Sequence, residues 1–202
     1  MPVCYSWFAR GKPLLVPYEA PQGRRVNVIG AFFSHGEEAG RFLWNAFAAV
    51  PKARGKTRKS PAEIAVAHGV SESVIATIDA ARFIAFVWRV AGRPDPAPDG
   101  WKRECPLTVV LDNYSVHKSR LVKDAQTAWA EAGVTLFYLP AYSPQMSAIE
   151  PVWRDVKAHG MPWRTQTTLG EAYKAVEEAL AQKAKRLQQK HCETKNLLTA
   201  PT

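Results

Sequence analysis

Two short apolar segments on either side of a helical pattern constrain the fold of this chain more than any other feature. The first, PLTVVLD, is β-branched and apolar until it ends at Asp112, and the second, VTLFYLP, covers residues 134–140. Residues 119–132 between them have a helical pattern. Two buried strands joined by a helix are expected to pair in parallel with a right-handed crossover. The sequence therefore predicts an α/β fold in which Asp112 terminates a buried strand.

A second acidic residue, Glu150, follows the second strand after a proline-containing loop. The segment AYSPQMSAIEPVWRDVK is predicted to become helical near Glu150, because Pro151 suits the first turn of a helix. Glu150, Arg154 and Lys157 share one face of this helix, which therefore carries an acid followed by two bases. The apolar stripe expected to face the core consists of Ile149, Val152, Trp153 and Val156.

Both ends of the chain have recognisable patterns. Residues 1–40 contain short extended pieces separated by Gly and Pro, which predicts a β-meander. Within it RVNVIGAFF, residues 25–33, is nearly continuously apolar and is expected inside the sheet. At the other end a capping box from Thr168 to Glu171 predicts a last helix that runs to about Lys190. Its inward stripe is expected to comprise Leu169, Tyr173, Val176 and Leu180.

Residues 41–100 are predicted to be a helical and basic insertion within a single domain that covers residues 1–202. Its basic part, KARGKTRKS, includes Arg54, Lys56 and Arg58. This segment is either an arm that contacts phosphates or a solvated loop. Residues 61–78 predict two short helices, which could form a helix-turn-helix that reads DNA or a plain helical hairpin. Residues 78–90 predict a strongly apolar helix that packs on the sheet.

Composition and charge limit the class of protein. The chain has 202 residues, of which 47% are hydrophobic and 22% are charged, a balance typical of one globular domain. Its net charge of +9 favours an anionic polymer such as nucleic acid as partner. The three cysteines have no metal-binding spacing, and no long apolar stretch or secretory pattern occurs. We therefore expect a cytoplasmic protein.

Asp112 and Glu150 are the candidate metal ligands. Ligands of open α/β sheets bind beyond the carboxyl ends of the strands, where both acids are expected. Mg²⁺ or Mn²⁺ prefers oxygen ligands, and two such ions can activate a nucleophile and stabilise the leaving oxygen of a phosphodiester. Each acid could instead be structural, and Glu150 in particular suits a helix start because of the helix dipole. The bases expected to contact phosphates near these acids are Lys118, Arg120, Arg154 and Lys157.

These segments resemble a known family. LTVVLDNYSVHKS followed by LFYLPAYSPQMSAIEPVWRDVK is similar to the second and third acidic motifs of mariner-superfamily transposases of bacterial insertion sequences, which are DDE-type enzymes. The resemblance rests on the order and spacing of Asp112, Asn113, His117, Leu139, Pro140, Tyr142, Ser143, Pro144, Ile149, Glu150, Trp153 and Lys157. It implies a ribonuclease H-like mixed sheet flanked by helices. It also implies a site for divalent metal and the cutting and joining of transposon ends.

The chain departs from the family pattern in two places. The family carries its first acid on a strand upstream of a segment like YSWFARGKP, whereas no Asp or Glu precedes Glu19 here. Ser147 and Ala148 stand where family members commonly have Asn and Pro. The sheet is therefore expected to lack the first catalytic strand, and activity of this chain is an open question. The N-terminal DNA-binding domain usual in such transposases is also expected to be missing.

The resemblance leaves two main hypotheses of function, because a ribonuclease or repair nuclease on the same fold fits the transposase-like succession LPAYSPQMSAIEPVW less well. The first is a transposase catalytic domain that cleaves and joins DNA with Mg²⁺ or Mn²⁺, two ions in a complete site, and that is a homodimer in the full-length protein. The second is an inactive fragment that binds DNA or dimerises. His117 either orients a ligand or touches the scissile phosphate, or else is held by ordinary hydrogen bonds at a helix start. Trp153 is expected to be a core anchor beneath Glu150. No membrane is expected as partner, and DNA binding would place the protein at the nucleoid.

Overall fold

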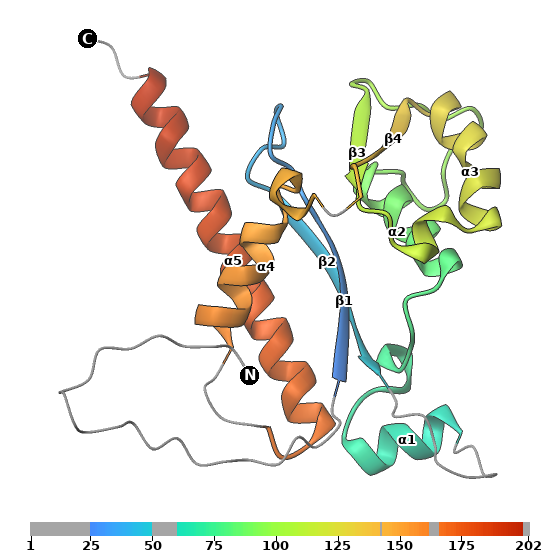
Figure 1. Ribbon diagram of the computed structural model, residues 1–202, viewed down its shortest axis with the longest axis vertical. Helices are drawn as coiled ribbons and strands as arrows, with labels where there is room; N and C mark the ends of the chain where they lie inside the picture. The colour runs from blue at the N-terminus through green and yellow to red at the C-terminus, as the bar shows by residue number, and fades with distance from the viewer. Residues whose placement is uncertain (1–24, 50–59, 142, 162–165, 200–202) are drawn as a thin grey trace.

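The computed structural model describes residues 25–49, 60–141, 143–161 and 166–199 and has the predicted α/β character (Figure 1). Strands β1 (Arg25–Phe32) and β2 (Phe42–Ala49) form an antiparallel pair. Strands β3 (Leu107–Leu111) and β4 (Val134–Tyr138) form a parallel pair. The predicted mixed sheet would combine both kinds of pairing in one sheet. In the described residues, however, the two pairs are separate and are not hydrogen-bonded to each other. They meet through side chains, because Ile29 of β1 and Leu107 of β3 both pack on a buried cluster of Phe33, Phe86 and Val90.

The predicted strand, helix and strand around Asp112 are confirmed. Helix α3 (Arg120–Glu131) connects β3 to β4, and Ser119 caps it by accepting a hydrogen bond from the Val122 N–H at 3.4 Å. Helix α2 (Ala80–Val90) packs beside α3, and its cap is Asp79, which accepts from the Arg82 N–H at 2.8 Å. Together the two helices bury one side of the β3–β4 pair around a core that includes Phe83, Val122 and Trp129.

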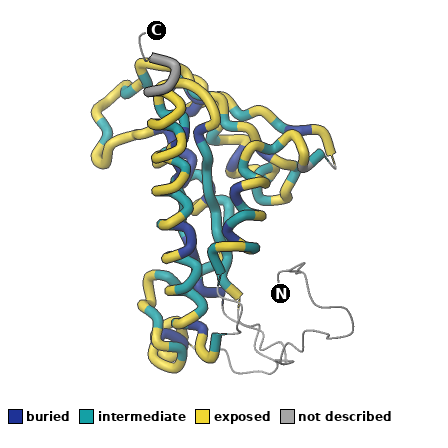
Figure 2. Tube along the Cα trace, turned by 90° about the vertical axis from the view of Figure 1, so that its left-hand side faces the viewer, coloured by how far each residue is buried: buried dark blue, intermediate teal, exposed yellow. Residues whose placement is uncertain are grey.

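The β1–β2 pair is covered by the last two helices. Helix α4 (Glu150–Asp155) continues into a π-helical turn, η4 (Val156–Gly160), and α5 (Leu169–Thr199) follows. The predicted stripe of α4 holds, because Val152 and Val156 are buried with Phe42, Ala179 and Leu180. Figure 2 shows buried residues along the side of the long helix that faces the rest of the chain. No described helix is both long and apolar enough to span a membrane.

The capping box predicted for the last helix is present. The Glu171 N–H donates to Thr168 Oγ1 at 3.1 Å, and the Thr168 N–H donates to Glu171 Oε2 at 3.3 Å. Of the predicted inward stripe, Leu169 and Leu180 are each 1% exposed. The helix extends to Thr199, beyond the end expected near Lys190.

The start of the predicted helical and basic insertion, residues 41–100, is a strand and not a helix. Residues 42–49 form β2, because alternate residues such as Phe42, Ala46 and Ala48 can be buried when the segment pairs along the whole length of β1. Strand β1 itself is partly rather than fully buried. Among the described residues it has a hydrogen-bonded neighbour, β2, on only one of its two edges. The basic residues Arg54, Lys56 and Arg58 lie outside the described residues.

The prediction of two short helices in residues 61–78 holds only for the first, so neither a helix-turn-helix nor a plain helical hairpin forms. Helix α1 (Pro61–His68) forms with a complete capping box between Ser60 and Glu63, and Gly69 ends it in a left-handed conformation with φ 64°. The second element, η1 (Glu72–Val74), is a single 3₁₀ turn, and Ser71 makes no capping hydrogen bond. The chain then becomes extended, because Ile75 forms a bridge to Ala48 of β2. A recognition helix therefore has no room to form here.

Candidate active site

Asp112 lies directly after β3, as predicted, with its side chain largely in solvent. The side chain is 69% exposed, and Oδ1 accepts a hydrogen bond from the Tyr114 N–H at 3.1 Å. The same oxygen lies 2.9 Å from His117 Nδ1. Both contacts use Oδ1, so within the described part of the chain Oδ2 has no protein partner. The carboxylate is therefore oriented through one oxygen and open to a ligand through the other.

His117 is held in place by three neighbouring elements. It lies in the 3₁₀ turn η2 (Ser115–Lys118), and its side chain is only 16% exposed. Its ring stacks at 4.5 Å between centroids on Phe83 of α2, and its carbonyl accepts a hydrogen bond from the Tyr138 hydroxyl at 2.8 Å. His117 Nδ1 also lies 3.3 Å from the Asp112 carbonyl oxygen. Of the predicted catalytic residues, Asp112 and His117 are thus brought together.

Asn113 and Tyr138 support this arrangement but were not among the predicted site residues. Asn113 Nδ2 donates to the Leu139 carbonyl at 2.6 Å, which ties the loop after β3 to the loop after β4. Tyr138, the last residue of β4, supports His117 from the neighbouring strand. The position of Asn113 directly after Asp112 was a signal in the sequence, whereas the contact of Tyr138 follows from the register of the two strands.

Glu150 begins α4, as predicted, and its side chain is exposed. Its N–H donates to the Ser147 carbonyl at 3.2 Å, which closes the turn before the helix. The neighbouring Trp153 anchors α4 on the β1–β2 pair by packing edge-on against Phe42, with 5.5 Å between the ring centroids. A Cβ atom at Gly30 of β1 would lie 2.5 Å from Trp153 Cη2, so this close approach requires glycine. The predicted role of Trp153 as a core anchor is confirmed.

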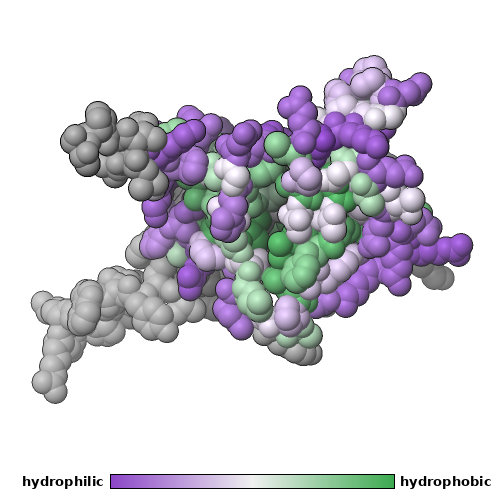
Figure 3. Space-filling view, turned by 90° about the horizontal axis from the view of Figure 1, so that it is seen from above, coloured by the Kyte–Doolittle hydropathy of each residue, from purple (hydrophilic) through white to green (hydrophobic). Residues whose placement is uncertain are grey.

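The face of the β3–β4 pair that α2 and α3 do not cover is open. Val110 and Phe137 are paired in register and are 51% and 55% exposed. Figure 3 shows hydrophobic side chains gathered in the middle of the molecule, with hydrophilic side chains around them. Exposed apolar surface of this kind is typical of a binding face.

The predicted phosphate-binding bases near the two acids are all exposed. Arg120 is 94% exposed and has only a distant ion pair with Asp124, at 3.9 Å. Lys118, Arg154 and Lys157 are exposed as well. Arg54, Lys56 and Arg58, the other predicted DNA-binding residues, belong to the part of the chain that is not described.

The donor chemistry of Asp112 and Glu150 fits a divalent metal, although a shared site stays a prediction. Two exposed carboxylates are suitable ligands for Mg²⁺ or Mn²⁺, which retain several waters in protein sites. Among the described residues, no group of three His, Cys, Asp or Glu side chains forms a ready set of metal ligands.

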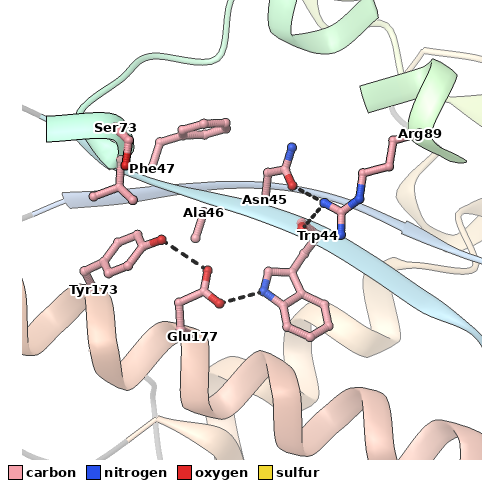
Figure 4. Close-up of a pocket in the computed structure, with 9 residues that line it drawn as sticks. Trp44, Asn45, Ala46, Phe47, Ser73, Arg89, Tyr173 and Glu177 are labelled. Atoms are coloured by element: carbon pink, nitrogen blue, oxygen red, sulfur yellow. Dashed lines mark hydrogen bonds between the residues drawn. The ribbon is translucent and has the colours of Figure 1, made fainter. Parts of the chain in front are cut away.

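A separate cavity of about 380 Å³ lies between β2, η1, α2 and α5 (Figure 4). On one side Glu177 accepts hydrogen bonds from Trp44 Nε1 at 3.1 Å and from the Tyr173 hydroxyl at 3.5 Å. Burial, and then the adjacent Glu177, raises the pKa of Tyr173 above its ordinary value. On the other side Arg89 donates to Asn45 Oδ1 and to the Trp44 carbonyl. These polar groups bind one another and join α2 and α5 to β2, which is a structural role.

Comparison with known proteins identifies the family of the chain. The family model described as DDE superfamily endonuclease matches residues 69–169, half of the chain, and this segment contains Asp112, His117 and Glu150. A search of curated proteins found no match. Since the family match covers the strand, helix and strand unit and both candidate acids, the chain belongs to the DDE superfamily endonucleases.

Proposed function

We propose that this protein derives its chemistry from a mariner-type transposase of a bacterial insertion sequence and acts on DNA phosphodiesters with Mg²⁺ or Mn²⁺. The observation that carries the proposal is the oriented carboxylate of Asp112, open to solvent at the end of β3 and held by His117. The family match supports a nuclease of the transposase type and hence DNA as substrate. A ribonuclease H-like sheet, homodimerisation and association with the nucleoid belong to the same proposal.

The roles of the residues follow from their positions. Divalent metal, when bound by Asp112 and Glu150, would activate the attacking water or 3′-hydroxyl and stabilise the leaving oxygen. His117 orients Asp112 through Oδ1, and Asn113 fixes the loop that carries both residues. Lys118, Arg120, Arg154 and Lys157 are exposed cations that would bind the phosphates of the DNA strand.

A second candidate function is a catalytically inactive fragment that binds DNA or dimerises. The observation that favours it is the set of exposed cations, among them Arg120, Arg154 and Lys157, which could bind DNA without any catalysis. The net charge of +9 would still allow such a fragment to bind DNA.

Titration with Mn²⁺ separates the two functions. An isothermal titration of the chain should reveal a site that Asp112→Ala and Glu150→Ala each weaken strongly, and Mg²⁺-dependent strand transfer on transposon-end DNA should be lost in both variants. The matched control is Glu104→Ala, which removes an exposed acid before β3. Absence of a Mn²⁺ site together with salt-dependent DNA binding would favour the inactive fragment. Undiminished activity in both variants would rule out the assigned roles.

A further inference from the structure

The charge of α5 changes along its length. Between residues 169 and 180 the helix carries three acids and one lysine, whereas residues 181–199 carry five Lys or Arg residues and one acid, Glu193. In Figure 1 this second half continues past α4 towards the C-terminus. The helix dipole does not account for the change, because its effect is confined to the last turn and Arg186 and Lys190 precede that turn.

Three of these bases are spaced to lie on one face of the helix, next to α4. Lys183, Arg186 and Lys190 are separated by three and four residues, which places them one above the other. Lys183 fixes the direction of this face, because its Nζ lies 2.8 Å from Asp155 Oδ2 of α4. Arg186 and Lys190 continue along the same side and are exposed. We call these three residues the basic row.

The basic row leads towards the beginning of α4. A Cβ atom at Gly160 would lie 3.1 Å from the Ala179 Cβ, and Asp155 pairs with Lys183, so the two helices run in opposite directions. Arg186 and Lys190 therefore lie further towards Glu150, at the start of α4. The environment of Asp155 agrees: its pKa is lowered by the hydrogen bond from Lys183 and by the charges of Lys183, His159 and Arg186, against the opposing effect of burial. This one carboxylate is thus surrounded by cations.

We propose that Arg186 and Lys190, the exposed part of the basic row, bind the phosphate backbone of DNA as it approaches the Glu150 end of α4. The proposal rests on the proposed function only in taking DNA as the partner. Exposed cations aligned along a helix can neutralise phosphates of the backbone, and such contacts carry no sequence preference. Lys183 is only 17% exposed and is paired with Asp155, so it positions the row rather than binding DNA.

The test is DNA binding by the complete chain in EDTA, with a fluorescent duplex of arbitrary sequence at several salt concentrations. The double variant Arg186→Glu/Lys190→Glu should bind DNA roughly tenfold more weakly or worse. The slope of log K against log salt concentration should also become less steep by about two, because two phosphate contacts are lost. The matched control is Lys174→Glu/Lys185→Glu, which makes the same change in charge on the side of α5 away from α4 and should keep the slope of the parent chain. Circular dichroism of each variant checks that the helix is intact.

The outcomes separate this proposal from the proposed function. Equal losses in the two double variants would show an effect of net charge alone and would overturn the proposal, as would full binding by Arg186→Glu/Lys190→Glu. Because EDTA removes catalysis, the result does not depend on a metal site. If Mn²⁺ does not bind while the basic row still controls DNA affinity, the catalytic assignment fails and this proposal stands.

Discussion

At the scale of single residues, His117 has the most constrained position in the candidate site. Its ring contacts the carboxylate of Asp112 and packs against Phe83, and its backbone carbonyl accepts a hydrogen bond from the Tyr138 hydroxyl, so both the ring and the backbone of His117 are held in place. Groups that orient a metal ligand contribute to metal affinity without touching the ion. If Asp112 binds metal, His117 therefore acts as a positioning residue and not as a general base.

The first prediction separates this role from a purely structural one. His117→Phe should keep the ring packing on Phe83 but lose the contact with Asp112, so Mn²⁺ affinity should fall by about 10–100-fold with little change in thermal midpoint. Titration calorimetry and a thermal melt measure the two effects. A variant that melts early but binds Mn²⁺ like the parent chain would show that His117 serves only the fold.

At the scale of elements, the position of α4 depends on how closely Trp153 approaches β1. The second prediction is that Gly30→Ala destabilises the protein by roughly 1–3 kcal/mol, because the added methyl group would meet the indole ring. Gly30→Ala/Trp153→Leu should lose less stability than the two single changes added together, since the smaller side chain removes the clash. Urea denaturation of the four proteins measures this coupling. Strict additivity would contradict the packing described here.

The ion pair between Asp155 and Lys183 joins α4 to α5 and gives a prediction about pH. The pKa of Asp155 is lowered in the folded chain, first by its hydrogen bond from Lys183. The pair therefore stabilises the fold above the ordinary pKa of Asp, and this contribution is lost as the pH falls through the lowered value. Asp155→Asn should reduce stability by about 0.5–1 kcal/mol near neutral pH, an estimate discounted because a third of the Asp155 side chain is exposed.

Denaturation curves of the parent chain and Asp155→Asn across the acid range measure this difference. The two curves should converge at low pH, where the carboxyl is protonated in both the folded and the unfolded state. A difference that persists unchanged in acid would mean that the amide disturbs packing and that the ion pair contributes nothing.

At the scale of the whole molecule, the elements that the sequence predicted well are those fixed by local patterns. The strand ending at Asp112, the cap at Ser119 and the box from Thr168 to Glu171 each depend on residues close together in the chain. The errors concern long-range pairing. Residues 42–49 are apolar enough for a helix or a strand, and β1 decides between them. The second helix predicted near Ser71 was lost because Ile75 bridges to Ala48.

In the candidate site too, local patterns predicted the positions of residues, whereas long-range packing determines their contacts. The sequence placed Asp112 and Glu150 at a strand end and a helix start, because those positions follow from local patterns. The contacts that orient Asp112 depend on α2 and β4, which supply Phe83 and Tyr138. Such contacts cannot be deduced before the packing of these elements is known.

Whether the two strand pairs unfold together is the last prediction. Each pair has its own buried cluster, but Phe33, Phe86 and Val90 join them, and α5 contacts both strands of the antiparallel pair. We expect one cooperative transition, so Leu180→Ala, at a side chain 1% exposed, should lower the midpoint equally by far-ultraviolet circular dichroism and by tryptophan fluorescence. The loss should be about 2–5 kcal/mol, whereas Leu121→Ala, at a side chain 58% exposed, should change stability by less than about 0.5 kcal/mol. Two separated transitions in Leu180→Ala, with the second at the midpoint of the parent chain, would show that the parallel pair and its helices fold independently of α5.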